Sequence, residues 1–396
     1  KNKNSLILIT FKKKLKNIDA SGYLRKRIII DNNKTKQLKI NNKLITSFAS
    51  NDYLGMSNNS DVVKELSNSA NKYGVGSGSS PLITGYSKSH HYLEKEITEY
   101  LNVESCIVTN SGYLANLCLL NIFDEEMSVI QDKESHNSII ESSKLNKVKL
   151  SRYKHLDDKH LISYLKKKDN HILFSESVFS MSGDVTNIKQ HYAYKKKYGA
   201  LMFVDDAHGF AIAKRNKDDS ILENSCSMYN IKPSSVDAYM GTFGKAVGTI
   251  GAFICGDKSL VEMILQKGKP YIYSTALPRC IIDATRKSLE ILNTNKNKYE
   301  KLHDNISYFN QICKAKNIKM NPSNVPIKTY NVGNPHLTME IRDKFLRDGI
   351  LVQGIRYPTV PKGHDKIRIT ITANHMKKDI DKLLNTLENI ICEKSE

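Results

Sequence analysis

Between residues 47 and 278, short apolar runs typical of β-strands alternate with longer segments typical of amphipathic helices. The strand-like runs are 106–109, 128–130, 172–174, 201–204 and 251–254, and apolar residues recur at helical spacing in 89–101 and 187–198. Strands that alternate with helices in this way form a mostly parallel sheet with helices on both faces. The pattern therefore predicts a large α/β domain and constrains the fold more than any other feature of the sequence.

The two ends of the chain differ from this central region. The first 45 or so residues are basic and irregular, and they predict a helix and a short hairpin. After Pro278 come two long helical stretches, short strands and a last helix whose apolar residues recur at helical spacing, which predicts a smaller α+β domain. We expect an N-terminal segment (1–46), a large domain (47–280) and a small domain (281–396), with a substrate cleft between the two domains.

Composition excludes several classes of protein. No run approaches the roughly 20 apolar residues that a membrane span needs, and the apolar patch near the start is too short for a signal peptide, so we expect a cytoplasmic protein without a membrane partner. The seven cysteines are scattered and contain no Cys-x-x-Cys pair. Reduced thiols are therefore expected, and no metal site is predicted.

The formal charge of +19 invites a nucleic-acid hypothesis. The excess is mostly lysine, is spread along the chain and comes with many Asn and Ile, which is typical of an AT-rich coding bias. Attraction of an acidic substrate or carrier is the alternative interpretation. No zinc finger, RNA-binding motif or basic helix with heptads supports nucleic-acid binding, so no nucleic-acid partner is predicted.

A carboxylate and an imidazole follow the strand-like run 201–204, and a lysine follows a further short apolar run that also resembles a strand. Lys245 lies in a loop of small residues, with Thr242 three residues before it, and Asp205 and His208 follow 201–204. Ligands of open α/β sheets bind outside the carboxyl ends of the strands, so the two segments are candidate walls of one site. A Schiff-base lysine, with an acid that pairs with a pyridinium nitrogen, is how proteins use pyridoxal 5'-phosphate (PLP). Buried Asp205 would need such a partner.

Other polar residues near expected strand ends are candidate cofactor contacts. Gly112 and Tyr113 begin an apolar helix, where free amides favour a phosphate, although a simply capped helix is the alternative. His136 is a candidate stacking ring and Ser180 a candidate donor, and each is alternatively an ordinary turn residue. The glycine-rich loop 74–80 lacks the spacing of a dinucleotide fingerprint and predicts only a tight turn near the ligand.

An amino-acid substrate of a PLP enzyme also needs a cation for its α-carboxylate. Arg368 lies on one face of the alternating run 367–371, as a bidentate carboxylate clamp would. An ordinary exposed arginine on a strand is the alternative.

Together, six motifs resemble the α-oxoamine synthases, a family of fold type I PLP enzymes, over about residues 47–387. The motifs are Ser50-Asn51-Asp52-Tyr53-Leu54-Gly55, Ser111-Gly112-Tyr113-Leu114-Ala115-Asn116, Asp205-Asp206-Ala207-His208-Gly209, Thr242-Phe243-Gly244-Lys245, Ile272-Tyr273-Ser274-Thr275-Ala276-Leu277-Pro278 and Arg356-Tyr357-Pro358-Thr359-Val360-Pro361. The resemblance implies an α/β fold type I PLP-dependent transferase, with a large mostly parallel sheet domain and a smaller α+β C-terminal domain.

The resemblance also implies roles for individual residues. Lys245 would be the Schiff-base lysine, Asp205 the partner of the pyridine nitrogen and His136 the stacking ring, and these three form the predicted catalytic set. The further cofactor contacts that it implies are Gly112, Tyr113, Ser180, His208, Thr242, Ser274 and Thr275, the last two reaching the phosphate across a homodimer interface. The implied substrate contacts are Arg25, Asn51, Thr359 and Arg368.

Within the family, the sequence is most similar to the acyltransferases of biotin biosynthesis, an assignment favoured by 356–361 and 368–373. These condense L-alanine with pimeloyl-CoA or a pimeloyl carrier protein to give 8-amino-7-oxononanoate and CO2. Sister enzymes that use glycine, serine or another acyl thioester are the alternative: 2-amino-3-ketobutyrate CoA ligase, 5-aminolevulinate synthase, serine palmitoyltransferase or an autoinducer synthase.

Two positions depart from the family pattern: Pro81 stands where many relatives have arginine, and Ala246 replaces the more usual glycine after the lysine. The first change would alter contacts with the acyl substrate, and the second lies near the cofactor. An inactive basic scaffold or nucleic-acid-binding protein with the same fold is a further alternative, against which the intact Lys245, Asp205 and His208 argue.

Overall fold

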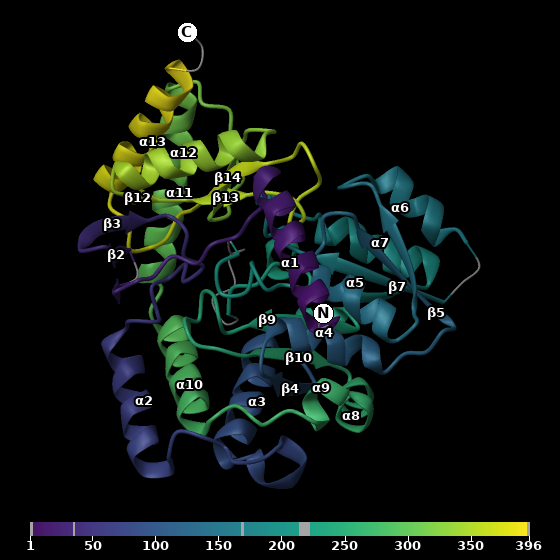
Figure 1. Cartoon of the computed structure of the whole chain (residues 1–396). Helices are drawn as coiled ribbons and strands as arrows, with labels where there is room; N and C mark the ends of the chain where they lie inside the picture. Colours follow the sequence, from purple (N-terminus) through teal and green to yellow (C-terminus); the bar gives the residue numbers. More distant parts are fainter. Residues whose placement is uncertain (1–2, 35, 168–169, 214–221, 394–396) are drawn as a thin grey trace. The chain divides into compact units, whose positions relative to one another are not determined.

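The computed structural model describes residues 3–34, 36–167, 170–213 and 222–393 (Figure 1). Its internal contacts divide the chain into two compact units. The central unit comprises Asn51–Asp304 and Ser323–Val325, and the terminal unit comprises Lys1–Ser50, Asn305–Pro322 and Pro326–Glu396. The predicted division of the chain after residues 46 and 280 stays a prediction.

The central unit contains a seven-stranded sheet with the order β4-β10-β9-β8-β7-β5-β6. Its strands are β4 (Ser105–Thr109), β5 (Met127–Asp132), β6 (Lys149–Tyr153), β7 (Asn170–Glu176), β8 (Leu201–Asp205), β9 (Ala238–Thr242) and β10 (Ala252–Gly256). Only β10 runs against its neighbours, pairing antiparallel with β4 and β9, whereas the other neighbouring pairs are parallel. The prediction of a mostly parallel sheet is confirmed.

Apolar residues on both faces of this sheet are covered by helices. Val129 and Ile172 pack in a cluster with α4 (Gly112–Asn121), α5 (Asn137–Leu145) and α8 (Lys258–Lys267). The next residue of each strand, Ile130 and Leu173, packs in a second cluster with α6 (Asp158–Leu165) and α7 (Ile188–Tyr198). Because side chains alternate between the faces of a strand, a strand covered on both sides must be apolar throughout.

The remaining helices of the central unit are α2 (Ser60–Tyr73), α3 (Lys88–Leu101), the short α9 (Lys269–Ile272) and α10 (Arg279–Thr294), and α11 (Asn297–Ala315) contains the boundary between the units. Helix α10 packs against α2 and α3. A turn with π-helical bonding spans Pro81–Gly85, so the departure at Pro81 lies at its first residue. Among the described residues, no helix is both long and apolar enough to cross a membrane.

A buried carboxylate, Asp206, fixes the end of β8. It accepts hydrogen bonds from the hydroxyls of Ser177, Ser225 and Tyr239 and from the backbone N–H of Ser225. Burial raises the pKa of Asp206, and these donors partly offset that rise. Gly209 lies directly against the network, because a Cβ at this position would be 2.1 Å from both Asp206 Oδ1 and Ser225 Oγ.

The terminal unit contains two small sheets. The first has the order β1-β2-β3-β12 and consists of β1 (Asn32–Lys34), β2 (Gln37–Ile40), β3 (Lys43–Ser47) and β12 (Ile350–Leu351). The second has the order β11-β14-β13 and consists of β11 (Ile327–Asn331), β14 (Lys366–Thr370) and β13 (Gln353–Ile355). Helices α1 (Lys3–Ala20), α12 (Pro335–Arg347) and α13 (Lys377–Cys392) complete this unit, and α13 buries the apolar face that its sequence pattern predicts.

We expect Gly209→Ala to destabilise the central unit by about 2 kcal/mol, because the added methyl must displace an atom of the Asp206 network. The urea midpoint of unfolding measures this change. Gly76→Ala is the matched control, since a Cβ at Gly76 would meet no atom within 4 Å. Equal midpoints for the two variants would contradict the prediction.

A second prediction concerns His191, which is buried in α7 beside the Ser175 hydroxyl. Burial lowers the pKa of His191 from 6.5 to about 4. As the pH falls below 6.5, the unfolded chain therefore binds a proton that the folded chain does not bind, and the free energy of unfolding decreases. Between pH 7 and pH 5, we expect the wild type to lose about 2 kcal/mol more unfolding free energy than His191→Gln. Parallel urea-stability profiles of the two proteins would exclude this role.

Candidate active site

Five strands of the central sheet point the same way and are followed by predicted site residues. Gly112 follows β4, His136 follows β5 and Ser180 follows β7, whereas Asp205 ends β8 and Thr242 ends β9, three residues before Lys245. Strand β4 shares this direction because it and β9 are both antiparallel to β10. The carboxyl edge of one sheet therefore collects these residues, as expected for a ligand site of an open α/β sheet.

Asp205 is buried, and groups from two segments hold its carboxylate. The side-chain amide of Asn116, on α4, donates to Asp205 Oδ2 at 2.8 Å and to Ser138 Oγ at 2.9 Å. The backbone N–H of Ala207 donates to Asp205 Oδ1 at 3.0 Å. Each carboxylate oxygen accepts at least one bond, so the side chain is oriented and retains lone pairs for a cationic partner.

His136 precedes α5 and caps that helix with its ring. Its Nδ1 accepts a bond from the backbone N–H of Ser138 at 3.3 Å, which leaves the proton of a neutral ring on Nε2. Burial is the main cause that lowers the pKa of His136; the positive charge of Lys245 lowers it further, and Asp205 opposes both. The ring of Tyr113 lies edge-on to it, with ring centroids 6.3 Å apart. A neutral imidazole suits a stacking role.

Glu176, at the end of β7, belongs to the same cluster. Its Oε2 accepts the backbone N–H of His136 at 2.8 Å. Burial, and secondly the charge of Asp205, raise the pKa of Glu176 to about 8 against the opposing effects of Lys245 and of the N–H groups of His136 and Ser180. Glu176 is therefore mostly neutral at pH 7, so Asp205 is the main negative charge beside Lys245.

His208, on the loop after β8, is held by a tyrosine from the beginning of the unit. The hydroxyl of Tyr53 and Nδ1 of His208 are 2.6 Å apart, and Tyr53 is fully buried. The predicted substrate contact Asn51 lies beside this pair, and its backbone oxygen accepts the N–H of Tyr53 at 2.8 Å. The Nδ1 of His208 is engaged, so a ligand would meet the other side of the ring.

The predicted phosphate contacts lie around the first residue of α4. A Cβ built on Gly112 would be 3.9 Å from Cβ of Thr242, so the start of this helix and the end of β9 are neighbours. Ser111 caps the helix by accepting the N–H of Leu114. The Thr242 hydroxyl donates to the backbone oxygen of Gly251 at 2.9 Å, and its contact with a phosphate stays a prediction.

The loop after α9 carries Ser274 and Thr275. The side-chain amide of Asn110 donates to the backbone oxygen of Thr275 at 2.8 Å, which ties this loop to the end of β4. Thr275 is exposed and Ser274 is half-buried. Their predicted reach across a homodimer interface stays a prediction. Ala246, the second departure from the family pattern, is buried next to Lys245.

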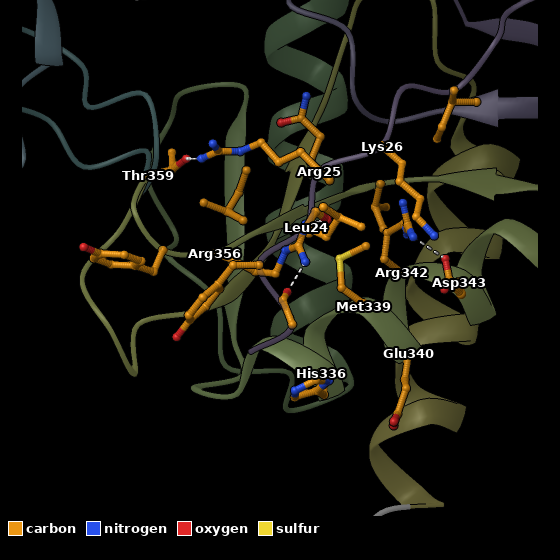
Figure 2. A pocket seen from close by; sticks show the side chains of 18 of the residues that line it. Leu24, Arg25, Lys26, His336, Met339, Glu340, Arg342, Asp343, Arg356 and Thr359 are labelled. Atoms are coloured by element: carbon orange, nitrogen blue, oxygen red, sulfur yellow. Dashed lines mark hydrogen bonds and ion pairs between the residues drawn. The ribbon is translucent and has the colours of Figure 1, made fainter. Parts of the chain in front are cut away.

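Three predicted substrate residues belong to the terminal unit. Arg25 Nη2 donates to the Thr359 hydroxyl at 3.3 Å, and both residues line a cavity of about 740 Å³ (Figure 2). Arg368 is buried in β14, where it donates to Gln353 Oε1 at 3.2 Å and to the Thr370 hydroxyl at 3.0 Å. The alternative of an exposed strand arginine is therefore wrong. Its role as a carboxylate clamp stays a prediction.

Several residues that form this site had no role predicted from the sequence. Asn116, Ser138 and Glu176 orient or surround Asp205 and His136, and Tyr53 holds His208. Asn116 and Tyr53 lie inside motifs that carried the family resemblance, so a signal was present. Glu176 ends a buried strand, and a carboxylate in that position is itself a signal for a paired or perturbed group.

The donor set of the central unit fits PLP. Asp205 is an oriented, buried carboxylate that suits a protonated pyridine nitrogen, and Lys245 is close enough to affect the pKa of His136 and of Glu176. The first turn of α4, which lies next to Thr242, supplies neutral backbone donors for a phosphate. The part of the chain that the structure describes contains no group of three or more His, Cys, Asp or Glu side chains that could hold a metal.

Comparisons with known proteins identify the family of the chain. The family model for aminotransferase class I and II matches residues 43–387. The 8-amino-7-oxononanoate synthase of Saccharophagus degradans is 36% identical over 89% of this chain and 88% of its own length. That of Thermoanaerobacter pseudethanolicus is 30% identical over 96% of each chain.

Solved structures show the same fold. The crystal structure of 8-amino-7-oxononanoate synthase from Francisella tularensis has a TM-score of 0.77 at 27% identity and covers 89% of this chain and 99% of its own. A serine palmitoyltransferase from S. paucimobilis with bound PLP has a TM-score of 0.88 at 23% identity, covering 96% of each chain, a likeness that shows the fold alone. The chain therefore has fold type I and belongs to the aminotransferase class I and II family, as an α-oxoamine synthase.

Proposed function

We propose that the protein is a PLP-dependent acyltransferase that condenses L-alanine with a pimeloyl thioester in biotin biosynthesis. In the net reaction, the α-carbon of alanine bonds to the thioester carbonyl carbon and the carbon–sulfur bond breaks. The α-carboxylate leaves as CO2, the α-carbon regains one proton, and the thiol of CoA or of a carrier protein is released. The product is 8-amino-7-oxononanoate.

One observation carries this proposal: Lys245, Asp205 and His136 interact at the carboxyl edge of a single sheet. Relatives that are 36% and 30% identical to nearly the whole chain have the name of this activity, which supports the choice of substrates. The greater likeness in fold to a serine palmitoyltransferase, at 23% identity, does not decide between amino acids.

When bound, PLP supplies an electron sink for the negative charge that develops on the α-carbon of the amino acid. Lys245 would hold the cofactor through Nζ and, once released, move the α-proton. Asp205 would pair with the pyridine nitrogen, and the bond from Asn116 keeps its carboxylate oriented for that pairing. The neutral ring of His136 would cover one face of the cofactor and exclude water there.

The remaining predicted residues would position substrate and cofactor. Ser180, His208, Thr242 and the first turn of α4 would hold the polar groups of the cofactor. Arg25, Thr359 and Arg368 would bind the carboxylate and acyl groups of the two substrates, since arginine recognises carboxylates with two parallel bonds. We further propose a cytosolic homodimer in which Ser274 and Thr275 serve the site of the partner subunit.

We expect Lys245→Ala to fold normally and to lose about 10³-fold or more of its turnover of L-alanine and pimeloyl-CoA, because it lacks the amine that is assigned to move the α-proton. It should also lack the visible absorption band of lysine-bound PLP. Lys258→Ala, an exposed lysine at the start of α8, is the control and should keep both properties. Wild-type turnover by Lys245→Ala would exclude this mechanism.

Substitutions of two nearby carboxyl groups test whether Asp205 carries the main negative charge of the site. Asp205→Asn removes the main negative charge of the site and should lower kcat by about 10²-fold or more. Glu176→Gln should lower kcat by less than about fivefold, because the pKa of Glu176, at about 8, leaves it already mostly neutral at pH 7. Steady-state rates with L-alanine check both variants. If Glu176→Gln proves as damaging as Asp205→Asn, the role assigned to Asp205 is wrong.

A further inference from the structure

The positive charge of the chain is concentrated at one end. Residues 1–50 contain thirteen Lys and Arg residues, two Asp and no Glu, so they carry +11 of the formal charge of +19. A uniform compositional bias would not place more than half of the charge in an eighth of the chain. This segment therefore needs an explanation of its own.

Most of this charge lies on or just after α1 (Lys3–Ala20). Every side chain from Ile7 to Ala20 is exposed. Along one side of the helix run five large apolar residues at helical spacing, each between 42% and 58% exposed: Ile7, Leu8, Phe11, Leu15 and Ile18. Lys12, Lys13 and Lys16 lie outside this stripe, as does the exposed Ile9, and Lys14 lies at its edge. Helices in proteins owe most of their stability to packing of an apolar face, so this stripe calls for a partner.

The chain that follows α1 forms one wall of the cavity in Figure 2. Gly22, Tyr23 and the residues up to Lys26 line it, and Arg342 and Arg356 lie in its other walls. Arg356 donates to the backbone oxygens of Gly22 and Leu24, which ties this wall to the rest of the unit. A basic helix therefore leads directly into a cavity that contains several arginines.

The cavity itself favours an anion. Burial lowers the pKa of Arg356, and the positive charges of Arg342 and Arg25 lower it further. Arg342 forms one ion pair, with Asp343 at 2.6 Å, and its buried Nε has no hydrogen-bond partner among the described residues. Asp19, Glu340 and Asp343 also line this cavity of about 740 Å³, so a negatively charged ligand would be bound by direct hydrogen bonds to the guanidinium groups rather than by a strong net positive charge.

We propose that α1 and Arg25–Arg27 form the docking surface for an acidic carrier protein that delivers the acyl thioester, with the phosphate-bearing arm of the carrier entering the adjacent cavity. This inference rests on the proposed function and decides between its two thioester donors. The apolar stripe packs against apolar residues of the carrier, and the lysines pair with its acidic rim.

Charge complementarity favours this occupant over a second copy that packs α1 against α1. Such a copy would bring a second +11 segment to the same surface, and like charges disfavour that interface. An anionic membrane would also attract the helix, and its lipid phosphates could reach the arginines of the cavity, so vesicle binding is an outcome that the test includes. An acidic protein with an anionic arm satisfies both features at once.

The test compares one acyl group on two thiols. With pimeloyl-CoA and with pimeloyl on a small acidic acyl carrier protein, we would measure kcat and KM for the wild type and for Lys12→Glu/Lys13→Glu/Lys16→Glu. We expect KM for the carrier-bound substrate to rise by about tenfold or more, because steering and rim contacts are lost. The kcat, and KM for pimeloyl-CoA, should change by less than about twofold.

Two further variants make the result specific. Phe11→Ser/Leu15→Ser should raise KM for the carrier substrate alone, and circular dichroism checks that α1 stays helical. Lys258→Glu/Lys267→Glu/Lys269→Glu makes the same charge change on exposed lysines of α8 and α9 and should leave KM for the carrier substrate within about threefold of the wild type.

Several results would overturn the inference. If the α1 variants change KM equally for both thioesters, or leave KM for the carrier substrate unchanged, carrier docking on α1 is excluded. The proposed function would be unaffected by either result. If the kinetics with the carrier substrate are unchanged and the protein sediments with phosphatidylglycerol vesicles in a way that depends on α1, the occupant of the docking surface is a membrane. A change in sedimentation mass in the variants, with equal losses on both substrates, would make it a second copy. Failure of the wild type on both thioesters would instead refute the proposed function.

Discussion

The candidate site depends on how two adjacent carboxylates are held at the end of β8. Neighbouring residues of a strand point to opposite faces, so Asp205 and Asp206 enter different surroundings. Asp206 accepts four bonds, from Ser177, Ser225 and Tyr239, and its capacity is used within the protein. Asp205 accepts bonds from Asn116 and from the backbone of Ala207 and keeps lone pairs for a ligand. One carboxylate therefore anchors the strand end so that the other can bind.

Much of this arrangement could be predicted from the sequence, because it depends on local pattern. Apolar runs bounded by turns located β4, β5, β7, β8 and β10, and polar residues at the ends of such runs predicted which side chains share the sheet edge. Strand β6 was not predicted, because Lys149–Tyr153 is mostly polar and contains no apolar run, as is common in an edge strand. Helix α12 was also not predicted, although Asn334 and Pro335 are start signals for a helix.

The hydrogen-bond partners of the site residues could not be predicted, because they come from segments that are distant in the sequence and meet only in the folded unit. Tyr53 and His208 are 155 residues apart and meet only in the folded unit. Asn116 reaches Asp205 from a helix that packs on one face of the sheet, across 89 residues. The pKa of Glu176 depends on complete burial and on the nearby charge of Asp205, and neither can be read from the residues around it in the sequence.

The two units differ in the charged groups that they offer to a ligand. With Glu176 mostly neutral at pH 7 and His136 held neutral by burial, the cluster at the sheet edge contains one main negative charge, Asp205, and one main positive charge, Lys245. A phosphate that enters this cluster must rely on neutral donors, and the start of α4 beside Thr242 provides them. The arginines that share a cavity belong instead to the terminal unit. A phosphate on the acyl donor would find guanidinium donors there, in a lining that also contains Asp19, Glu340 and Asp343, whereas the sheet edge would place it beside the carboxylate that the chemistry needs.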